Sequence, residues 1–231
     1  SGDFNLASGA AINFSAFDNA LAITANDVDI QGTITMGTGQ LAFTASFDGT
    51  MGIGAATCGG TCGMTISGAE FQRITTTNIQ FLTTGGTAMY IDSLTATNTA
   101  NSTGLVQFSS NGDITVSGSA LTFNMAGTGG NGININANAG AGGGTGTLFL
   151  NTGVTVTAGG LTMRGKTAVS IATGLTFTAG DSIDLQKFGS TFASGNITAA
   201  GAATFNAGNG ITVDENLNAS GDLIFNADSD N

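Results

Sequence analysis

The sequence contains no proline, no histidine and no tryptophan in its 231 residues. Without histidine, imidazole acid–base catalysis and histidine-ligated metal sites are excluded. Without proline, a collagen-like triple helix is excluded, and strands paired on both edges lose none of their backbone donors. These absences exclude several classes of function and favour a chain built from continuously paired strands.

Charged residues are also scarce, at 8% of the chain against about 25% in an ordinary globular protein. Four basic residues (Arg73, Arg164, Lys166 and Lys187) accompany fifteen acidic ones, which gives a formal net charge of −11. This deficit of cations excludes the electrostatic footprint of a nucleic-acid binder and argues against docking on anionic membranes. No apolar run approaches the roughly 20 residues that span a bilayer, so we expect no membrane insertion.

The only cysteines lie close together, in the segment Cys58-Gly59-Gly60-Thr61-Cys62. A disulfide across this short loop fits an oxidising, extracellular setting. A free thiol pair and half of a metal site are the alternatives, although no other thiol or imidazole is present to complete a metal site. Because the sequence opens at Ser1 without a basic-then-apolar leader, we expect a processed chain or a fragment.

The apolar residues fall in short alternating triplets, such as Ile34-Thr35-Met36 and Leu41-Ala42-Phe43. Alternation with period two is typical of brief, half-buried strands. No window sustains apolar residues at the i, i+3, i+4 and i+7 positions of an amphipathic helix. The sequence therefore predicts an all-β fold.

In the second half of the chain every third triplet recurs after about 21 residues, which is a repeat signature. The predicted columns are Val154, Leu175, Ile197 and Leu217; Leu161, Ile183, Ala203 and Leu223; and Leu148, Val169, Phe192 and Ile211. A coil of about 21 residues with three short strands predicts a parallel β-helix (β-solenoid), in which strands stack at about 4.8 Å. This period predicts roughly eleven rungs in a rod of about 50 Å.

We expect residues 1–231 to form a single β-solenoid domain, with irregular rungs that carry loop insertions at 52–104. A second subdomain in that region is the alternative.

Several segments resemble the repeats of filamentous-haemagglutinin-type adhesins, chiefly within residues 105–231. They include 158–163 (AGGLTM), 178–185 (TAGDSIDL), 194–198 (SGNIT) and 219–224 (ASGDLI). This resemblance implies a long, right-handed β-helical rod at a bacterial cell surface, with a role in cell adhesion.

Candidate chemistry is sparse. Asp27 and Asp29 flank Val28, so we expect both to point to solvent, with weak Ca²⁺ binding as the alternative. Arg164 should lie near Asp184 one rung later, as a modest surface pair. Since no residue set fits a lyase or a glycosidase, we predict no enzymatic activity, no catalytic residues and no cofactor.

Short polar residues follow the strand triplets and predict a flat, uncharged face. Its members are Thr115, Asn134, Asn136, Thr155, Thr157, Thr176, Thr178 and Thr198. Such a face could bind ice or polysaccharide, or pack against a neighbouring filament. Its composition also fits a purely structural role, because threonine is a preferred polar strand residue and asparagines form hydrogen-bonded ladders along a stack.

The two ends of the predicted rod carry apolar strands without a recognisable cap. Ser220-Gly221-Asp222-Leu223 echoes Ser1-Gly2-Asp3-Phe4, and the predicted stacking residues are Phe4, Leu6, Leu223 and Phe225. Uncapped ends favour head-to-tail stacking into a homopolymer. The sequence thus predicts an extracellular structural protein, the subunit of a surface filament or adhesin stalk. A binding module that uses the polar face is the alternative.

Overall fold

The computed structural model describes residues 2–46, 49–56, 58–85, 87–124, 132–137, 145–187, 197–199, 203–207, 211–213 and 217–227. It is 58% strand and 4% helix, which confirms the all-β prediction. The described strands pair in parallel and form several sheets. In the regular part of the chain, consecutive strands join three different sheets in turn, and we call these sheets the first, second and third stacks.

The first stack is an eight-stranded sheet. In spatial order it contains β8 (Met64–Ile66), β7 (Met51–Gly54), β10 (Met89–Asp92), β12 (Ile114–Ser117), β15 (Thr147–Leu150), β18 (Ala168–Ile171), β21 (Ile197–Ala199) and β24 (Leu217–Ala219). The second stack contains β13 (Leu121–Phe123), β16 (Val154–Val156), β19 (Leu175–Ala179), β22 (Ala203–Ala207) and β25 (Leu223–Asn226).

The third stack contains β2 (Ala11–Phe14), β5 (Thr33–Met36), β9 (Ile74–Thr83), β11 (Ser102–Ser110), β14 (Gly132–Ala137), β17 (Gly160–Gly165), β20 (Ile183–Lys187) and β23 (Ile211–Val213). Two further strands, β3 (Leu21–Ala25) and β6 (Gln40–Ala45), join it through the second half of β9. A separate two-stranded sheet pairs β1 (Phe4–Leu6) with β4 (Val28–Ile30).

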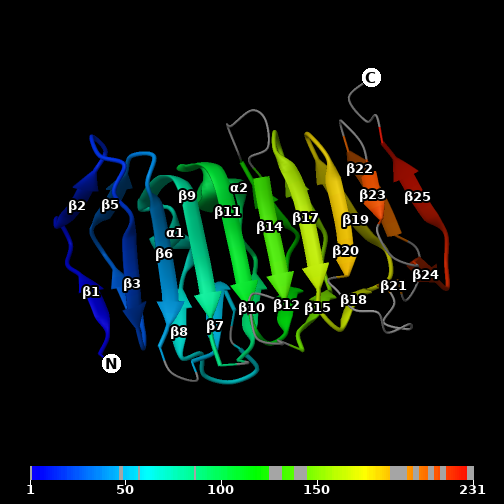
Figure 1. Cartoon of the computed structure of the whole chain (residues 1–231), viewed down its shortest axis with the longest axis horizontal. Coiled ribbons are helices and arrows are strands. Elements are labelled where there is room, and N and C mark those ends of the chain that lie inside the picture. The colour runs from blue at the N-terminus through cyan, green and yellow to red at the C-terminus, as the bar shows by residue number, and fades with distance from the viewer. Residues whose placement is uncertain are drawn as a thin grey trace.

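Strands follow one another along the longest axis of the molecule, from β1 at one end to β25 at the other (Figure 1). Strand pairing therefore runs along this axis, with parallel neighbours about 4.8 Å apart. An all-β chain of short parallel strands distributed over several sheets fits a β-helix or solenoid.

The core lies between the stacks and is filled by alternate residues of each strand. On β17, Leu161 and Met163 are fully buried, whereas Thr162 is only half-buried. Phenylalanines stack from level to level, as Phe81 does with Phe43 (centroids 5.8 Å apart) and with Phe108 (5.3 Å). Apolar side chains of successive strands thus form one continuous hydrophobic core.

The constant repeat length predicted from the sequence is wrong, because the length of one coil varies. Leu21 pairs with Leu41 and Ile197 with Leu217, whereas Ile183 pairs with Ile211 across a longer stretch of chain. A connection between two paired strands can differ in length from one coil to the next without altering their register. Within the described residues, the main path of the third stack consequently has eight strands rather than eleven. At the usual strand spacing it spans roughly 35 Å instead of about 50 Å.

Within each half the predicted columns join the correct strands where the structure describes them, but they are wrongly joined across residues 186–196. The pairs Leu161–Ile183, Leu148–Val169 and Ala203–Leu223 are confirmed. Leu175 pairs with Ala203, however, and Val169 pairs with Ile197. Val154 pairs with Phe177 rather than with Leu175, so the register differs there as well. Phe192 lies outside the described residues.

Irregular structure falls within residues 52–104, where the sequence predicted insertions. Two short helices, α1 (Gly68–Phe71) and α2 (Ala96–Thr99), pack against each other, and α2 also packs against β13. The two helices therefore extend the side of the molecule formed by the second stack, beyond its first described strand β13. Strand order in the first stack is also inverted here, because β8 follows β7 in sequence but lies between β4 and β7.

Side chains, rather than a neighbouring strand, provide hydrogen-bond partners for the backbone of Ile30 on β4. The Glu70 carboxylate of α1 accepts a hydrogen bond from the backbone N–H of Ile30 (2.9 Å), and the Arg73 guanidinium donates to the Ile30 carbonyl. Backbone polar groups that are removed from water require such partners. The two side chains thereby join the two-stranded sheet to the rest of the molecule.

Candidate functional site: the two end surfaces

The N-terminal end surface is formed by β1, β2 and β3. Each of these strands pairs along one edge only, with β4, β5 and β6 respectively, and its other edge has no strand partner among the described residues. A hollow of about 410 Å³ opens here, and Phe4, Leu21 and Ile23 are among its lining residues. Phe4 and Leu21 are only half-buried at this end, whereas Ile23 is buried.

The C-terminal end surface is formed by β23, β24 and β25, which pair with β20, β21 and β22. Their opposite edges likewise lack a strand partner within the described part of the chain. On β25, Ile224 and Phe225 are exposed to 56% and 46%. Unpaired strand edges with exposed apolar side chains are templates for a further strand.

Exposure of the core positions depends on their place along the axis. Phe177, Phe205 and Phe225 stack at 5.2 Å spacings, and the first two are fully buried while Phe225 is not. At the other end, half-buried Leu21 pairs with Leu41, which is fully buried. Phe225 and Leu21 are therefore less buried than their counterparts one level further in, since no described strand covers them.

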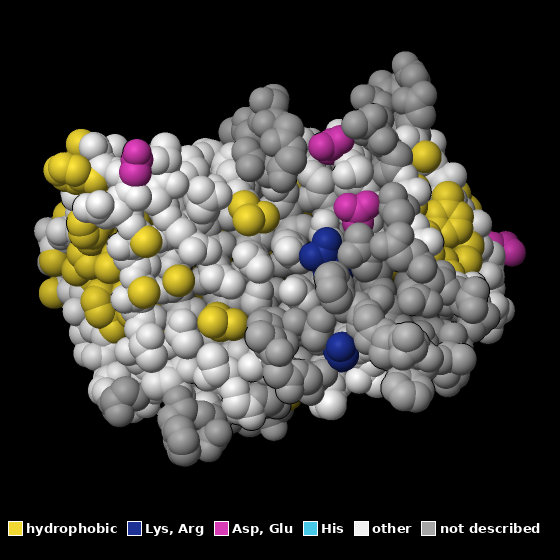
Figure 2. All heavy atoms as spheres, in the orientation of Figure 1, with side chains coloured by type: hydrophobic (Ala, Val, Ile, Leu, Met, Phe, Trp, Pro, Cys, Tyr) yellow, Lys and Arg dark blue, Asp and Glu magenta, His cyan; other side chains and the backbone are white. Residues whose placement is uncertain are grey.

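Apolar side chains gather at both ends of the long axis in the face shown in Figure 2. Among the described residues, the large hydrophobic side chains with high exposure are Phe17, Ile224 and Phe225, and all three belong to end levels. Acidic residues accompany them, since Asp3 precedes β1 and Asp222 precedes β25, and both are exposed. The two surfaces thus combine an apolar centre with charge of the same sign.

Of the predicted stacking residues, Phe4 and Leu6 lie on β1, and Leu223 and Phe225 lie on β25. The structure therefore brings each predicted pair to one end of the molecule. Leu6 is nearly buried, while Phe4 and Leu223 are half-buried. Phe17 and Ile224 were not predicted from the sequence. An apolar residue at an outward strand position was the available signal for Ile224, which pairs with Thr204.

The predicted disulfide between Cys58 and Cys62 is present, with the two Cα atoms 5.2 Å apart. It closes the loop that leads from β7 back to β8, where the strand order inverts. A Cβ built on Gly52 of β7 would lie 2.4 Å from the Cys62 sulfur. The disulfide therefore packs directly on the β7 backbone, at a position where a larger residue cannot fit.

The predicted polar face is not a single face. Thr115 and Thr198 belong to the first stack, Asn134 and Asn136 to the third. Thr155, Thr176 and Thr178 belong to the second stack, and Thr157 follows β16 of that stack. Only Thr155 and Thr178 face each other across neighbouring strands. The columns from which the face was built crossed from one sheet to another, so the prediction of one flat ladder is wrong.

The expected orientation of Asp27 is also wrong. Its carboxylate is half-buried and accepts hydrogen bonds from the backbone N–H (2.8 Å) and hydroxyl (3.0 Å) of Thr65, which connects β4 to β8. Asp29 is exposed as expected and accepts from Gln31. Asp184 faces Thr162, and Arg164 faces Gln186, so the predicted pair of charges lies diagonally on neighbouring strands.

No family model, no curated protein and no solved structure matches this chain. Within the described residues, neither helix is long and apolar enough to cross a membrane. The geometry of the end surfaces therefore provides the basis for a functional assignment.

Proposed function

We propose that the chain forms a right-handed parallel β-helix whose copies stack end to end, as the structural subunit of an extracellular filament or adhesin stalk. Its principal partner is a second copy of itself, and it has no catalytic role. Strands that visit three stacks in turn favour the β-helix, and parallel strands joined by crossovers are almost always right-handed. The Cys58–Cys62 disulfide favours an oxidising, extracellular location.

The observation that carries the proposal is that, among the described residues, the large hydrophobic side chains with high exposure lie at the end levels. Phe225 continues the stacked series of Phe177 and Phe205, yet it is 46% exposed because no described strand covers it. The hollow beside Phe4 and Leu21 is the corresponding opening at the other end. A second copy placed there would bury both surfaces and pair both sets of strand edges. Because the two surfaces differ, the contact is heterologous and produces a filament rather than a closed dimer.

Negative-stain electron microscopy with sedimentation tests this proposal. The wild-type protein should form unbranched fibres with an axial repeat of about 40 Å, the height of eight strand levels. Phe225→Asp should remain monomeric, because a carboxylate at the centre of the contact would lose its hydration without a partner. Thr155→Asp, on an outward position of β16 in the middle of the second stack, is the matched control and should form fibres.

The Phe225→Asp variant also tests polarity, because its N-terminal end surface is unchanged. Added in small proportion to wild-type protein, it should join one end of each fibre and stop growth there, which shortens the fibres. A wild-type protein that remains monomeric at every concentration contradicts the proposal. So does a Phe225→Asp variant that polymerises like the Thr155→Asp control.

A further inference from the structure

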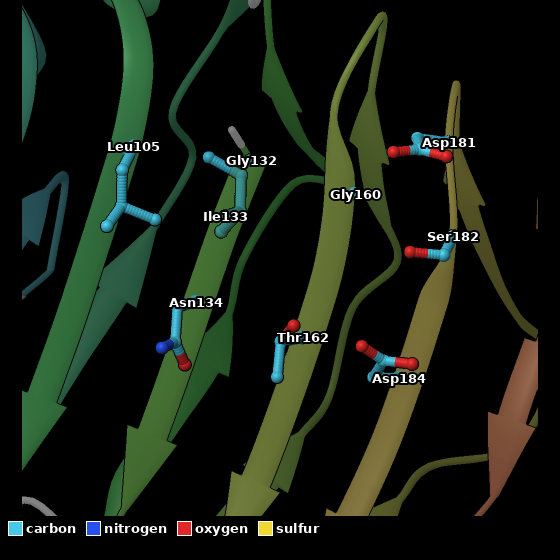
Figure 3. A pocket seen from close by; sticks show the side chains of 9 residues that line it. All are labelled: Leu105, Gly132, Ile133, Asn134, Gly160, Thr162, Asp181, Ser182 and Asp184. Atoms are coloured by element: carbon cyan, nitrogen blue, oxygen red, sulfur yellow. The ribbon is translucent and has the colours of Figure 1, made fainter. Parts of the chain in front are cut away.

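A hollow of about 260 Å³ lies on the outward face of the third stack, away from both end surfaces. It spans β11, β14, β17 and the start of β20, as Figure 3 shows. We call it the third-stack hollow. It is distinct from the polar face expected from the sequence, with which it shares only Asn134.

Two glycines of neighbouring strands line the floor of the hollow. Gly132 of β14 pairs with Gly160 of β17, and both are at positions where other levels carry side chains. A Cβ on Gly160 would project to 3.3 Å from the Ser182 hydroxyl. A Cβ on Gly132 would lie 2.0 Å from the Gly160 carbonyl oxygen, so the Gly160 backbone already fills the space beside Gly132. The missing side chain of Gly160 leaves a shallow space that a ligand ring could enter, in contact with the backbone.

Polar side chains border this floor along one row of the sheet. Asn134 pairs with Thr162, and Thr162 pairs with Asp184, so an amide, a hydroxyl and a carboxylate follow one another at about 4.8 Å. Asp181 and Ser182 complete the border, and the Ser182 hydroxyl points toward β17 in Figure 3. The side-chain oxygen of Asn134 is buried and has no hydrogen-bond partner among the described residues.

The composition of the hollow discriminates between ligands. Two carboxylates and no basic residue line it, which disfavours an anion, and Leu105 and Ile133 alone are too little apolar surface for a hydrophobic ligand. Its volume of about 260 Å³ is too much space for one bare metal ion. Hydroxyl, amide and carboxylate groups together suit a ligand that carries several hydroxyls, each able to donate and accept.

We propose that the third-stack hollow binds one ring of a neutral saccharide. The ring lies on the backbone of Gly132 and Gly160, and its hydroxyls donate to the carboxylates of Asp181 and Asp184. The hydroxyls of Thr162 and Ser182 donate to ring oxygens or accept from ring hydroxyls. Leu105 provides apolar contact for C–H groups of the ring. This site does not depend on end-to-end stacking, because it lies on the side of the molecule.

Saturation-transfer difference NMR with maltopentaose, cellopentaose and mannopentaose tests the proposal, and it works on monomers and fibres alike. At least one of these neutral oligosaccharides should receive saturation from the wild-type protein. Asp184→Asn and Thr162→Val should each weaken its binding about tenfold or more, since each removes hydrogen bonds that the ligand requires. Gly160→Ala should also weaken binding of the oligosaccharide, because the added methyl group would occupy part of the hollow.

Two matched variants control for general effects on the strands. Asp29→Asn removes the same charge from an exposed strand position on β4, and Thr115→Val removes the same hydroxyl from an outward position on β12. Both should bind like the wild type. The proposal fails if none of the three oligosaccharides binds at millimolar concentration, or if the hollow variants and the controls lose binding equally. Binding of Ca²⁺ alone, lost in Asp184→Asn, with no saccharide bound, would overturn it as well.

Discussion

At the scale of single residues, glycine positions decide how closely other groups approach the backbone. Gly52 is buried on β7 beneath the Cys58–Cys62 disulfide, whereas Gly60, within the disulfide loop, has open space around it. Gly132 allows the Gly160 carbonyl to approach its backbone, and both glycines line the third-stack hollow. The sequence shows that glycine is abundant, but only the strand register indicates which glycines accommodate another group.

We expect Gly52→Ala to destabilise the oxidised protein by about 1 to 3 kcal/mol, because the new methyl group overlaps the Cys62 sulfur. Removing the sulfur atoms should relieve this overlap, so the same substitution should cost less in a Cys58→Ala, Cys62→Ala background. Urea denaturation of the four proteins gives the coupling free energy.

Gly60→Ala is the control for this double-mutant cycle, because a Cβ at Gly60 meets no atom within 4 Å. It should change the free energy of unfolding by less than about 0.5 kcal/mol. If Gly52→Ala lowered the free energy of unfolding equally in both backgrounds, the disulfide would not be in close contact with Gly52 of β7.

At the scale of elements, the sequence predicted the strands well and the helices not at all. Alternating triplets identify strands such as β17 because side-chain direction has period two. The helices α1 and α2 are too short to show an apolar period. Their available signals were capping boxes, Ser67 with Glu70 and Thr95 with Asn98, which the structure contains in both cases.

The sequence predicted correctly which strands lie above one another only where the connections between strands are short. Ile197 and Leu217 were correctly aligned, but the longer coil from Val169 to Ile197 displaced the alignment by one strand. Hydrophobic periodicity measures spacing along the chain, whereas strand pairing depends on spacing in the sheet. The predicted polar face failed for this reason, while the predicted end residues did not depend on the alignment.

Glu70 connects a helix cap to a strand, so its loss should affect both elements. Its carboxylate accepts hydrogen bonds from the Ser67 backbone N–H (2.8 Å) and hydroxyl (2.7 Å), and from the Ile30 N–H (2.9 Å). We expect Glu70→Ala to lower the free energy of unfolding by about 2 kcal/mol, because these donors lose a charged acceptor. Chemical denaturation measures the loss.

Asp29→Ala is a suitable comparison for Glu70→Ala, since Asp29 is also acidic but exposed, with one hydrogen bond to Gln31. Its effect should stay within about 0.5 kcal/mol. If both substitutions lower the free energy of unfolding equally, the hydrogen bond between Glu70 of α1 and Ile30 of β4 contributes no more than a surface contact.

At the scale of the whole molecule, charge opposes the assembly that the end surfaces favour. Each copy carries a formal net charge of −11, and Asp3 and Asp222 place like charges at the two ends. An apolar contact has no need of ion pairs, so electrostatics contributes mainly repulsion between approaching copies. This balance makes assembly sensitive to salt.

We expect fibre formation, followed by light scattering, to accelerate as NaCl rises from about 0.01 M to 0.15 M, because the Debye length falls from about 30 Å to 8 Å. Asp222→Asn should assemble faster than the wild type at low salt. Asp29→Asn, which removes the same charge from β4, should have a smaller effect. Slower assembly at higher salt would instead indicate a contact held by ion pairs.

The direction of strand pairing, along the long axis of the molecule, has a mechanical consequence (Figure 1). Tension applied between the two ends acts along the hydrogen bonds that join one level to the next. The disulfide joins only Cys58 to Cys62 and therefore links no two levels covalently. A level that detaches, such as the coil from Leu21 to Leu41, exchanges about 4.8 Å of rod for about 70 Å of extended chain. A fibre of such copies would thus be stiff while its levels stay paired and would lengthen greatly as levels detach.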